Sequence, residues 1–201
     1  MAGMDSFLYK RFTEKTVLEA LKDTPVVLIH GSRQCGKTTL AQSVGKRLGY
    51  HYITFDDDNQ LNAARVDSVG FMESLPERAI LDEVQRVPEL FTAIKAKVDK
   101  ARKSGQFILT GSANVLLLPQ LADSLAGRME IIQLRPLSPS EIVGSKPDFI
   151  QQLFCADFGM DAIQGRYKRL GESLADHICQ GGYPAAIIRD NEKRRGVWYR
   201  D

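Results

Sequence analysis

The most informative stretch of the chain is Gly31-Ser32-Arg33-Gln34-Cys35-Gly36-Lys37-Thr38. It matches the pattern G-x-x-x-x-G-K-[ST] at every fixed position. An apolar run rich in β-branched residues, Pro25 to His30, precedes it and predicts a strand that is buried on both faces. After it, Leu40, Val44 and Leu48 recur at the spacing of an amphipathic helix. A strand, a glycine turn and a helix in this order predict a phosphate-binding loop.

Each part of this loop has a physical task in phosphate binding. Backbone N–H groups surround the phosphates, and Gly31 and Gly36 permit the close approach that this requires. The N-terminus of the following helix adds unpaired donors and the positive end of the helix dipole. We expect Lys37 to reach the β- and γ-phosphates and the Thr38 hydroxyl to bind Mg²⁺. The expected nucleotide-binding set is Gly31, Ser32, Arg33, Gln34, Cys35, Gly36, Lys37, Thr38 and Thr39.

Strand-like runs alternate with helical patterns as far as residue 135. Further strands are predicted at residues 51–55, 78–81, 106–109 and 129–134, and further helices at 13–21 and 90–103. The alternation predicts an α/β fold with a parallel sheet that is covered on both faces. Beyond Pro136 no run has comparable strand character. We therefore expect a core with an N-terminal helix at residues 1–138, followed by a smaller, mainly helical, lid-like region at 139–201.

Two adjacent carboxylates, Asp82 and Glu83, follow the short apolar run Ala79 to Leu81. Ligands of an open parallel sheet bind at the carboxyl ends of its strands. Asp82 is therefore expected to hold Mg²⁺ through its water shell, and Glu83 to orient and deprotonate the attacking water. The pair favours hydrolysis over phosphoryl transfer to a small molecule, because a kinase has no use for a water-activating carboxylate. The alternative is that the two acids merely begin the next helix.

Hydroxyl residues and an arginine complete the expected catalytic set. The run Phe107 to Leu109 ends in polar residues, of which Ser112 is the first choice and Thr110 the second for contacting the γ-phosphate or the attacking water. The alternative is a simple turn at the end of the strand. Arg128 precedes the run 129–134 and is expected at the rim of the nucleotide site, where it would stabilise transition-state charge in its own subunit or a neighbour's. The alternative is a solvated or structurally paired arginine.

These motifs together resemble those of a large family of prokaryotic ATPases in the AAA+ superfamily. The strings that carry the resemblance are Gly31 to Leu40, Leu81-Asp82-Glu83-Val84-Gln85, Leu109-Thr110-Gly111-Ser112, Ser124-Leu125-Ala126-Gly127-Arg128, Leu137-Ser138-Pro139-Ser140-Glu141 and Gly181-Gly182-Tyr183-Pro184. The resemblance implies a three-layer P-loop NTPase sandwich with the sheet order 5-1-4-3-2, and it implies ATP and Mg²⁺ as ligands. Family members continue into a C-terminal domain, so we expect this chain to be the N-terminal part and that domain to be a partner.

Composition excludes several other classes. The chain has 201 residues, 43% of them hydrophobic and 26% charged, which is the balance of a globular protein. Its net charge of +2 gives no whole-molecule attraction to nucleic acid, and the basic residues within 90–103 fit a solvated helix face better than a nucleic-acid patch. Three scattered cysteines fit neither a disulfide framework nor a metal site. No apolar run is long enough to span a membrane, and we expect a cytoplasmic location.

The sequence thus favours one function over three others. The leading expectation is a Mg²⁺-dependent ATP hydrolase that couples turnover to conformational change, with a second copy of the chain as a candidate partner at sites between subunits. The alternative is a nucleotide-gated switch or binding module with negligible turnover. The acid pair at 82–83 disfavours a small-molecule kinase, and the absence of an N-K-x-D string disfavours a GTPase.

Overall fold

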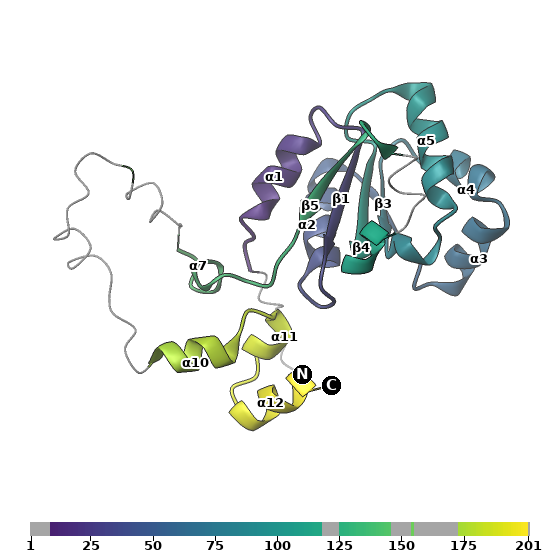
Figure 1. Ribbon diagram of the computed structural model, residues 1–201. Coiled ribbons are helices and arrows are strands. Elements are labelled where there is room, and N and C mark those ends of the chain that lie inside the picture. Colours follow the sequence, from purple (N-terminus) through teal and green to yellow (C-terminus); the bar gives the residue numbers. More distant parts are fainter. Residues whose placement is uncertain (1–8, 118–124, 146–153, 155–172, 201) are drawn as a thin grey trace. The chain divides into compact units, whose positions relative to one another are not determined.

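The computed structural model describes residues 9–117, 125–145, 154 and 173–200, and the chain divides into two compact units. The unit formed by residues 11–135 contains one parallel sheet in the order β2-β3-β4-β1-β5 (Figure 1). Its strands are β1 (Val26–Gly31), β2 (His51–Thr54), β3 (Ala79–Asp82), β4 (Phe107–Ser112) and β5 (Met129–Gln133). Read from the other edge, this is the order 5-1-4-3-2 that the family resemblance implies, so the predicted fold is confirmed.

Helices cover both faces of this sheet. One face carries α1 (Thr13–Ala20) and α2 (Lys37–Leu48), and the other carries α3 (Asp58–Val66), α4 (Ser68–Ser74) and α5 (Leu90–Ala101) (Figure 1). Short 3-10 turns, η1 (Val84–Arg86) and η2 (Ala113–Leu117), follow β3 and β4. Because both faces are covered, all six residues of β1 are buried.

Sequence analysis missed α3 and α4, each of which begins after an aspartate cap. Asp57 accepts a hydrogen bond from the Asn59 N–H at 2.8 Å, and Asp67 accepts one from the Gly70 N–H at 2.8 Å. An aspartate in this position satisfies a backbone donor that the first turn of a helix leaves unpaired. In the acidic loop that follows β2, Asp56-Asp57-Asp58, Asp57 is therefore the cap of α3 and Asp58 is the first residue of the helix.

The main hydrophobic core lies on the face covered by α3, α4 and α5. Leu28, Leu81 and Leu109 from three neighbouring strands belong to it and are fully buried. Lys97 of α5 donates hydrogen bonds to the carbonyl oxygen of Met72, at 2.5 Å, and to that of Leu75, at 2.9 Å. Two other basic residues of this region, Lys100 and Lys103, form ion pairs with Glu73 and Glu77.

The second unit comprises residues 1–10 and 136–201. Its helices are α7 (Pro139–Ile142), α10 (Ser173–Gln180), α11 (Pro184–Ile187) and α12 (Glu192–Arg200). Ser138 and Glu141 form a reciprocal capping box at the start of α7. The lid-like region at 139–201 stays a prediction, because residues 146–153 and 155–172 lie outside the described part of the chain. Within the described ranges, no helix is both long enough and apolar enough to cross a membrane.

Candidate nucleotide-binding site

The predicted phosphate-binding loop connects β1 to α2. Gly31 ends β1, and a Cβ at this position would lie 2.1 Å from the carbonyl oxygen of Leu134, so a larger residue does not fit. Gly36 precedes α2 with φ 100° and ψ 22°, a left-handed conformation that glycine adopts without strain. Because the residue at the helix cap is glycine, it offers no side-chain acceptor to the first N–H groups of α2. These groups remain donors for an anion.

Arg11 anchors the back of the loop. This residue is 8% exposed, and its Nη1 donates to the carbonyl oxygen of Cys35 at 2.8 Å. Its Nη2 donates to the carbonyl oxygen of Arg135, beyond β5. Cys35 is fully buried, with its Sγ 3.4 Å from the carbonyl oxygen of Leu134, so this side chain packs against the protein. The side chains at positions 33, 34 and 39 of the predicted set are exposed.

The side chain of Lys37 contacts the backbone of the loop. The residue is 5% exposed, and its Nζ donates to the carbonyl oxygen of Ser32 at 2.8 Å. A phosphate in the loop would offer this ammonium a charged acceptor, which forms a stronger hydrogen bond than a neutral carbonyl does. Nearby in sequence, burial lowers the pKa of His30, and the positive charge of Lys37 lowers it further. His30 Nδ1 is buried without a hydrogen-bond partner among the residues that the structure describes.

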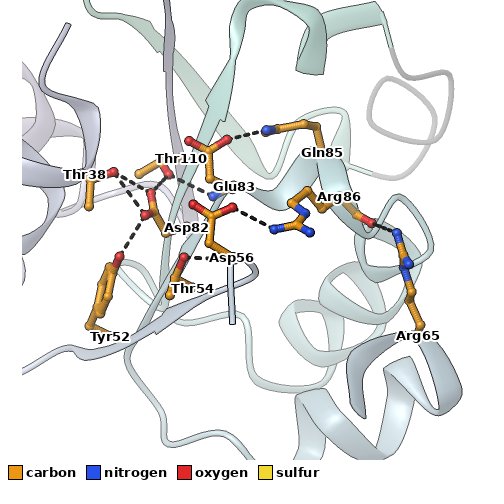
Figure 2. A network of polar contacts seen from close by, with 10 residues as sticks. All are labelled: Thr38, Tyr52, Thr54, Asp56, Arg65, Asp82, Glu83, Gln85, Arg86 and Thr110. Carbon is orange, nitrogen blue, oxygen red and sulfur yellow. Dashed lines mark hydrogen bonds and ion pairs between the residues drawn. The ribbon is translucent and has the colours of Figure 1, made fainter. Parts of the chain in front are cut away.

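Asp82, at the carboxyl end of β3, is the centre of a network of hydroxyl groups (Figure 2). Thr38 Oγ1, from the first turn of α2, lies 2.9 Å and 3.0 Å from the two carboxylate oxygens of Asp82. The hydroxyl of Thr110 on β4 donates to Oδ1, and that of Tyr52 on β2 donates to Oδ2 at 2.8 Å. Asp82 as a whole is 3% exposed. The two predicted Mg²⁺-binding residues, Thr38 and Asp82, are therefore in direct contact.

This arrangement fits a magnesium ion. A carboxylate and a hydroxyl are the hard oxygen ligands that Mg²⁺ prefers, and Mg²⁺ usually takes its other ligands from phosphates and water. In the described ranges, no group of three or more His, Cys, Asp or Glu side chains converges on a possible metal site. The assignment of Thr38 and Asp82 to the metal stays a prediction.

Sequence analysis did not identify Tyr52 as part of this site. Burial raises the pKa of Tyr52 to about 12, and both the hydrogen bond to Asp82 and the charge of that carboxylate contribute to the increase. The phenol is therefore protonated at neutral pH and is available as a hydrogen-bond donor. The only sequence signal was the position of Tyr52 in a strand that neighbours β3.

Glu83 turns away from Asp82 and is held by a glutamine. Its backbone is left-handed, with φ 60° and ψ 43°, a conformation that costs a non-glycine residue about 1–2 kcal/mol. The Glu83 N–H donates to Thr110 Oγ1 at 3.2 Å, and its carboxylate accepts a hydrogen bond from Gln85 Nε2. Gln85 Oε1 lies 3.3 Å from the backbone nitrogen of Ser112, whose N–H donates to it. Gln85 thus links the expected catalytic residues Glu83 and Ser112.

Ser112 and Thr110 occupy different places in the site. Ser112 is the register partner of Gly31, so it lies beside the start of the loop. Thr110, the second choice from sequence, is the residue whose hydroxyl contacts Asp82. The role of Ser112 at the γ-phosphate stays a prediction.

The segment after Glu83 is tied to the acidic loop and to α3. Arg86 Nη1 pairs with Asp56 Oδ1 at 2.7 Å, and the Arg86 carbonyl oxygen accepts from Arg65 Nη2 at 3.0 Å (Figure 2). These contacts hold η1, and with it Gln85, in place. Asp56 is engaged in this ion pair.

The prediction that Arg128 lies at the rim of its own nucleotide site is wrong. Its carbonyl oxygen accepts a hydrogen bond from the N–H of Val26, the first residue of β1. The phosphate-binding loop instead begins at Gly31, the last residue of β1. At ~3.3 Å per residue, the strand places these two points about 17 Å apart. An arginine just before a parallel strand lies at the amino ends of the strands, whereas ligands bind at their carboxyl ends. Arg128 instead pairs with Asp99 of α5, through Nε at 2.6 Å and Nη2 at 3.2 Å.

The Arg128–Asp99 pair matches the structural alternative for this arginine. Hydrogen bonding to Arg128 lowers the pKa of the Asp99 carboxyl below its ordinary value. A role for Arg128 in a neighbouring subunit's site stays a prediction.

Comparison with known proteins places this site in a family. The sequence model of a family described as "AAA domain" matches residues 23–143. The uncharacterized protein Rv2008c of Mycobacterium tuberculosis is 38% identical over 179 residues, which are 85% of this chain and 40% of the relative. The uncharacterized protein MJ1544 of Methanocaldococcus jannaschii is 25% identical over 199 residues, covering 88% of this chain and 41% of that protein. The chain thus spans about 40% of the length of these curated relatives.

Solved structures share the fold at low sequence identity. AMPPCP-bound DnaA from Aquifex aeolicus is 20% identical, with a TM-score of 0.50 over 88% of this chain and 57% of that one. A Walker-type ATPase of Pyrococcus abyssi is 14% identical, with a TM-score of 0.52 over 96% of this chain and 71% of that one. At these identities, the likeness establishes the architecture alone.

Proposed function

The chain belongs to the AAA domain family, and from this premise we propose that it binds ATP with Mg²⁺ and hydrolyses the bond between the β- and γ-phosphates. The direct contact between the Thr38 hydroxyl and the Asp82 carboxylate carries the proposal. This contact joins the start of the helix after the loop to the end of a neighbouring strand. It brings together the hydroxyl that we propose binds Mg²⁺ and the carboxylate that we propose holds the water shell of the ion. Aquifex aeolicus DnaA, which shares the fold, is a protein solved with the ATP analogue AMPPCP.

In the proposed mechanism, the loop binds the phosphates and the strand ends act on the γ-phosphate. The backbone N–H groups between Gly31 and Lys37 hold the phosphates, and Lys37 exchanges the Ser32 carbonyl for their oxygens. Thr38 and Asp82 would hold Mg²⁺, which when bound neutralises charge on the β- and γ-phosphate oxygens. Glu83 accepts a proton from the attacking water, and Gln85 fixes the direction of its carboxylate.

Larger-scale features are part of the same proposal. We propose that residues 139–201 act as a helical lid and that turnover drives conformational change in a longer protein or an oligomer. The alternative function is a nucleotide-gated switch. It uses the same loop and the same Mg²⁺ ligands, but it predicts negligible release of phosphate.

Binding is tested with Lys37→Ala. Loss of a hydrogen bond to a charged group costs about 1.5–3 kcal/mol, so AMPPCP affinity should fall roughly 10- to 150-fold by calorimetry. Lys46→Ala is the matched control, because Lys46 is an exposed lysine in the last turn of the same helix. Unchanged AMPPCP affinity in Lys37→Ala, or an equal loss in both variants, would contradict the proposed loop function.

A further inference from the structure

The hydroxyl of Tyr52 contacts Asp82, the carboxylate proposed to hold the water shell of Mg²⁺, from a strand that carries no part of the nucleotide motif. Tyr52 lies on β2, the edge strand next to β3, and its side chain is half-buried. Its Oη lies 2.8 Å from Asp82 Oδ2 (Figure 2). The register explains the reach, because Tyr52 pairs with Ile80, two residues before Asp82 on the same face of β3.

The two oxygens of Asp82 are each held from a different flanking strand. Thr110 on β4 donates to Oδ1, and Tyr52 on β2 donates to Oδ2. Thr38, the third donor, belongs to the loop-to-helix segment and is itself proposed as a metal ligand. The Tyr52 hydroxyl has no other proposed task, whereas Thr110 also accepts a hydrogen bond from the Glu83 N–H and is a candidate for contacting the γ-phosphate or the attacking water. Together Tyr52 and Thr110 fix the rotation of the carboxylate plane.

The character of these donors matters as much as their position. Among the residues that the structure describes, Asp82 forms no ion pair with a lysine, arginine or histidine. Neutral hydroxyl groups therefore orient the buried carboxylate, and no cationic side chain of the described ranges is paired with it. A cationic partner would instead compete with a divalent cation for the same oxygens. The surroundings of Asp82 thus suit a carboxylate that receives a metal and its water shell.

We propose that Tyr52 is a positioning residue for magnesium: its hydroxyl holds Asp82 Oδ2 so that the carboxylate receives the water shell of Mg²⁺ bound with a nucleoside triphosphate. This inference rests on the proposed function, and it adds a residue that acts on the metal through Asp82. Partners that orient a metal ligand from behind typically contribute 10- to 100-fold to metal affinity. A single neutral hydroxyl is expected at the lower end of that range.

The test separates metal binding from nucleotide binding. Calorimetry measures AMPPCP affinity with Mg²⁺ and with EDTA, and the ratio of the two affinities reports the contribution of the metal. In Tyr52→Phe, the affinity in EDTA is expected to equal that of the unmodified chain, and the ratio is expected to fall roughly 10-fold. Thr110→Val removes the donor to the other carboxylate oxygen and is expected to lower the same ratio.

Tyr50→Phe is the matched control. Tyr50 lies immediately before the same strand, and its hydroxyl donates to the carbonyl oxygen of Gly105 at 2.5 Å, so it does not act on Asp82. Its ratio is expected to stay that of the unmodified chain. Melting temperatures of all variants report whether each protein is folded.

Three results would overturn the inference, and they are distinguishable. If Tyr52→Phe leaves the ratio of AMPPCP affinities with Mg²⁺ and with EDTA unchanged, Tyr52 has no role in metal binding. An equal loss of affinity with Mg²⁺ and with EDTA assigns Tyr52 to the fold or the loop. An unmodified chain whose AMPPCP affinity does not depend on Mg²⁺ refutes the metal part of the proposed function itself, before any variant is compared.

Discussion

Gln85 offers a sharp test of how the proposed water-activating carboxylate is held. Its amide nitrogen donates to the Glu83 carboxylate, and its amide oxygen accepts from the Ser112 N–H at 3.3 Å. Gln85→Ala removes both bonds and leaves Glu83 free to rotate. A hydrogen bond to a charged group contributes about 1.5–3 kcal/mol, which corresponds to roughly 10- to 150-fold in rate when the bond is made in the transition state. We expect kcat for ATP hydrolysis to fall within this range, with KM unchanged.

Gln85→Glu separates the two bonds. The glutamate has the same size and keeps an acceptor for the Ser112 N–H, but it has no donor for Glu83 and places a second carboxylate beside it. We expect kcat to fall at least as far as in Gln85→Ala, because two adjacent carboxylates repel each other. Steady-state phosphate release, with AMPPCP affinity measured in parallel, gives both values. A Gln85→Glu protein with the kcat of the unmodified chain would show that the bond to Glu83 has no part in hydrolysis.

Two further predictions follow from residues outside the loop. Arg128→Ala should lower the melting temperature because it removes the ion pair with Asp99. In 1 M NaCl the difference in melting temperature from the unmodified chain should be smaller, because this pair is partly exposed and salt screens it. AMPPCP affinity should not change, and a large loss of affinity would contradict this structural role. His30 has a pKa lowered from 6.5 in the folded chain, so protons bind the unfolded state first as the pH falls below that value, and the free energy of unfolding decreases. Denaturant titrations between about pH 5 and 8 should show the free energy of unfolding decreasing toward low pH in the unmodified chain, and decreasing less steeply in His30→Phe. An equal dependence on pH in both proteins would refute this role of His30.

The sequence was sufficient for features that are encoded locally. The loop and its flanking elements form one contiguous pattern from Pro25 to Leu48, so the motif and the apolar spacing predict β1 and α2 together. The strand order needed more than local patterns, and it came from the resemblance to a known family. The helices α3 and α4 were missed because their aspartate caps are recognisable only when a helix is already expected after them.

Contacts between distant residues were the part that sequence patterns did not reveal. The bond from Tyr52 to Asp82 joins side chains 30 positions apart and depends on the register of β2 against β3. Arg128 was misplaced because its nearness to β5 was taken as nearness to the loop. In a parallel sheet, a residue that precedes a strand and a residue that follows one lie at opposite ends of the strands.

Phosphate release from Mg²⁺–ATP by the unmodified chain, measured beside Glu83→Gln, tests the central claim most directly. The amide keeps the size of the side chain but accepts no proton, so Glu83→Gln should bind AMPPCP as the unmodified chain does. A general base contributes on the order of 10²–10⁴ in rate, and phosphate release by the variant should fall accordingly. Release by Glu83→Gln at the rate of the unmodified chain would refute the role of Glu83. Tight AMPPCP binding with no phosphate release by the unmodified chain would contradict ATP hydrolysis and favour the nucleotide-gated switch.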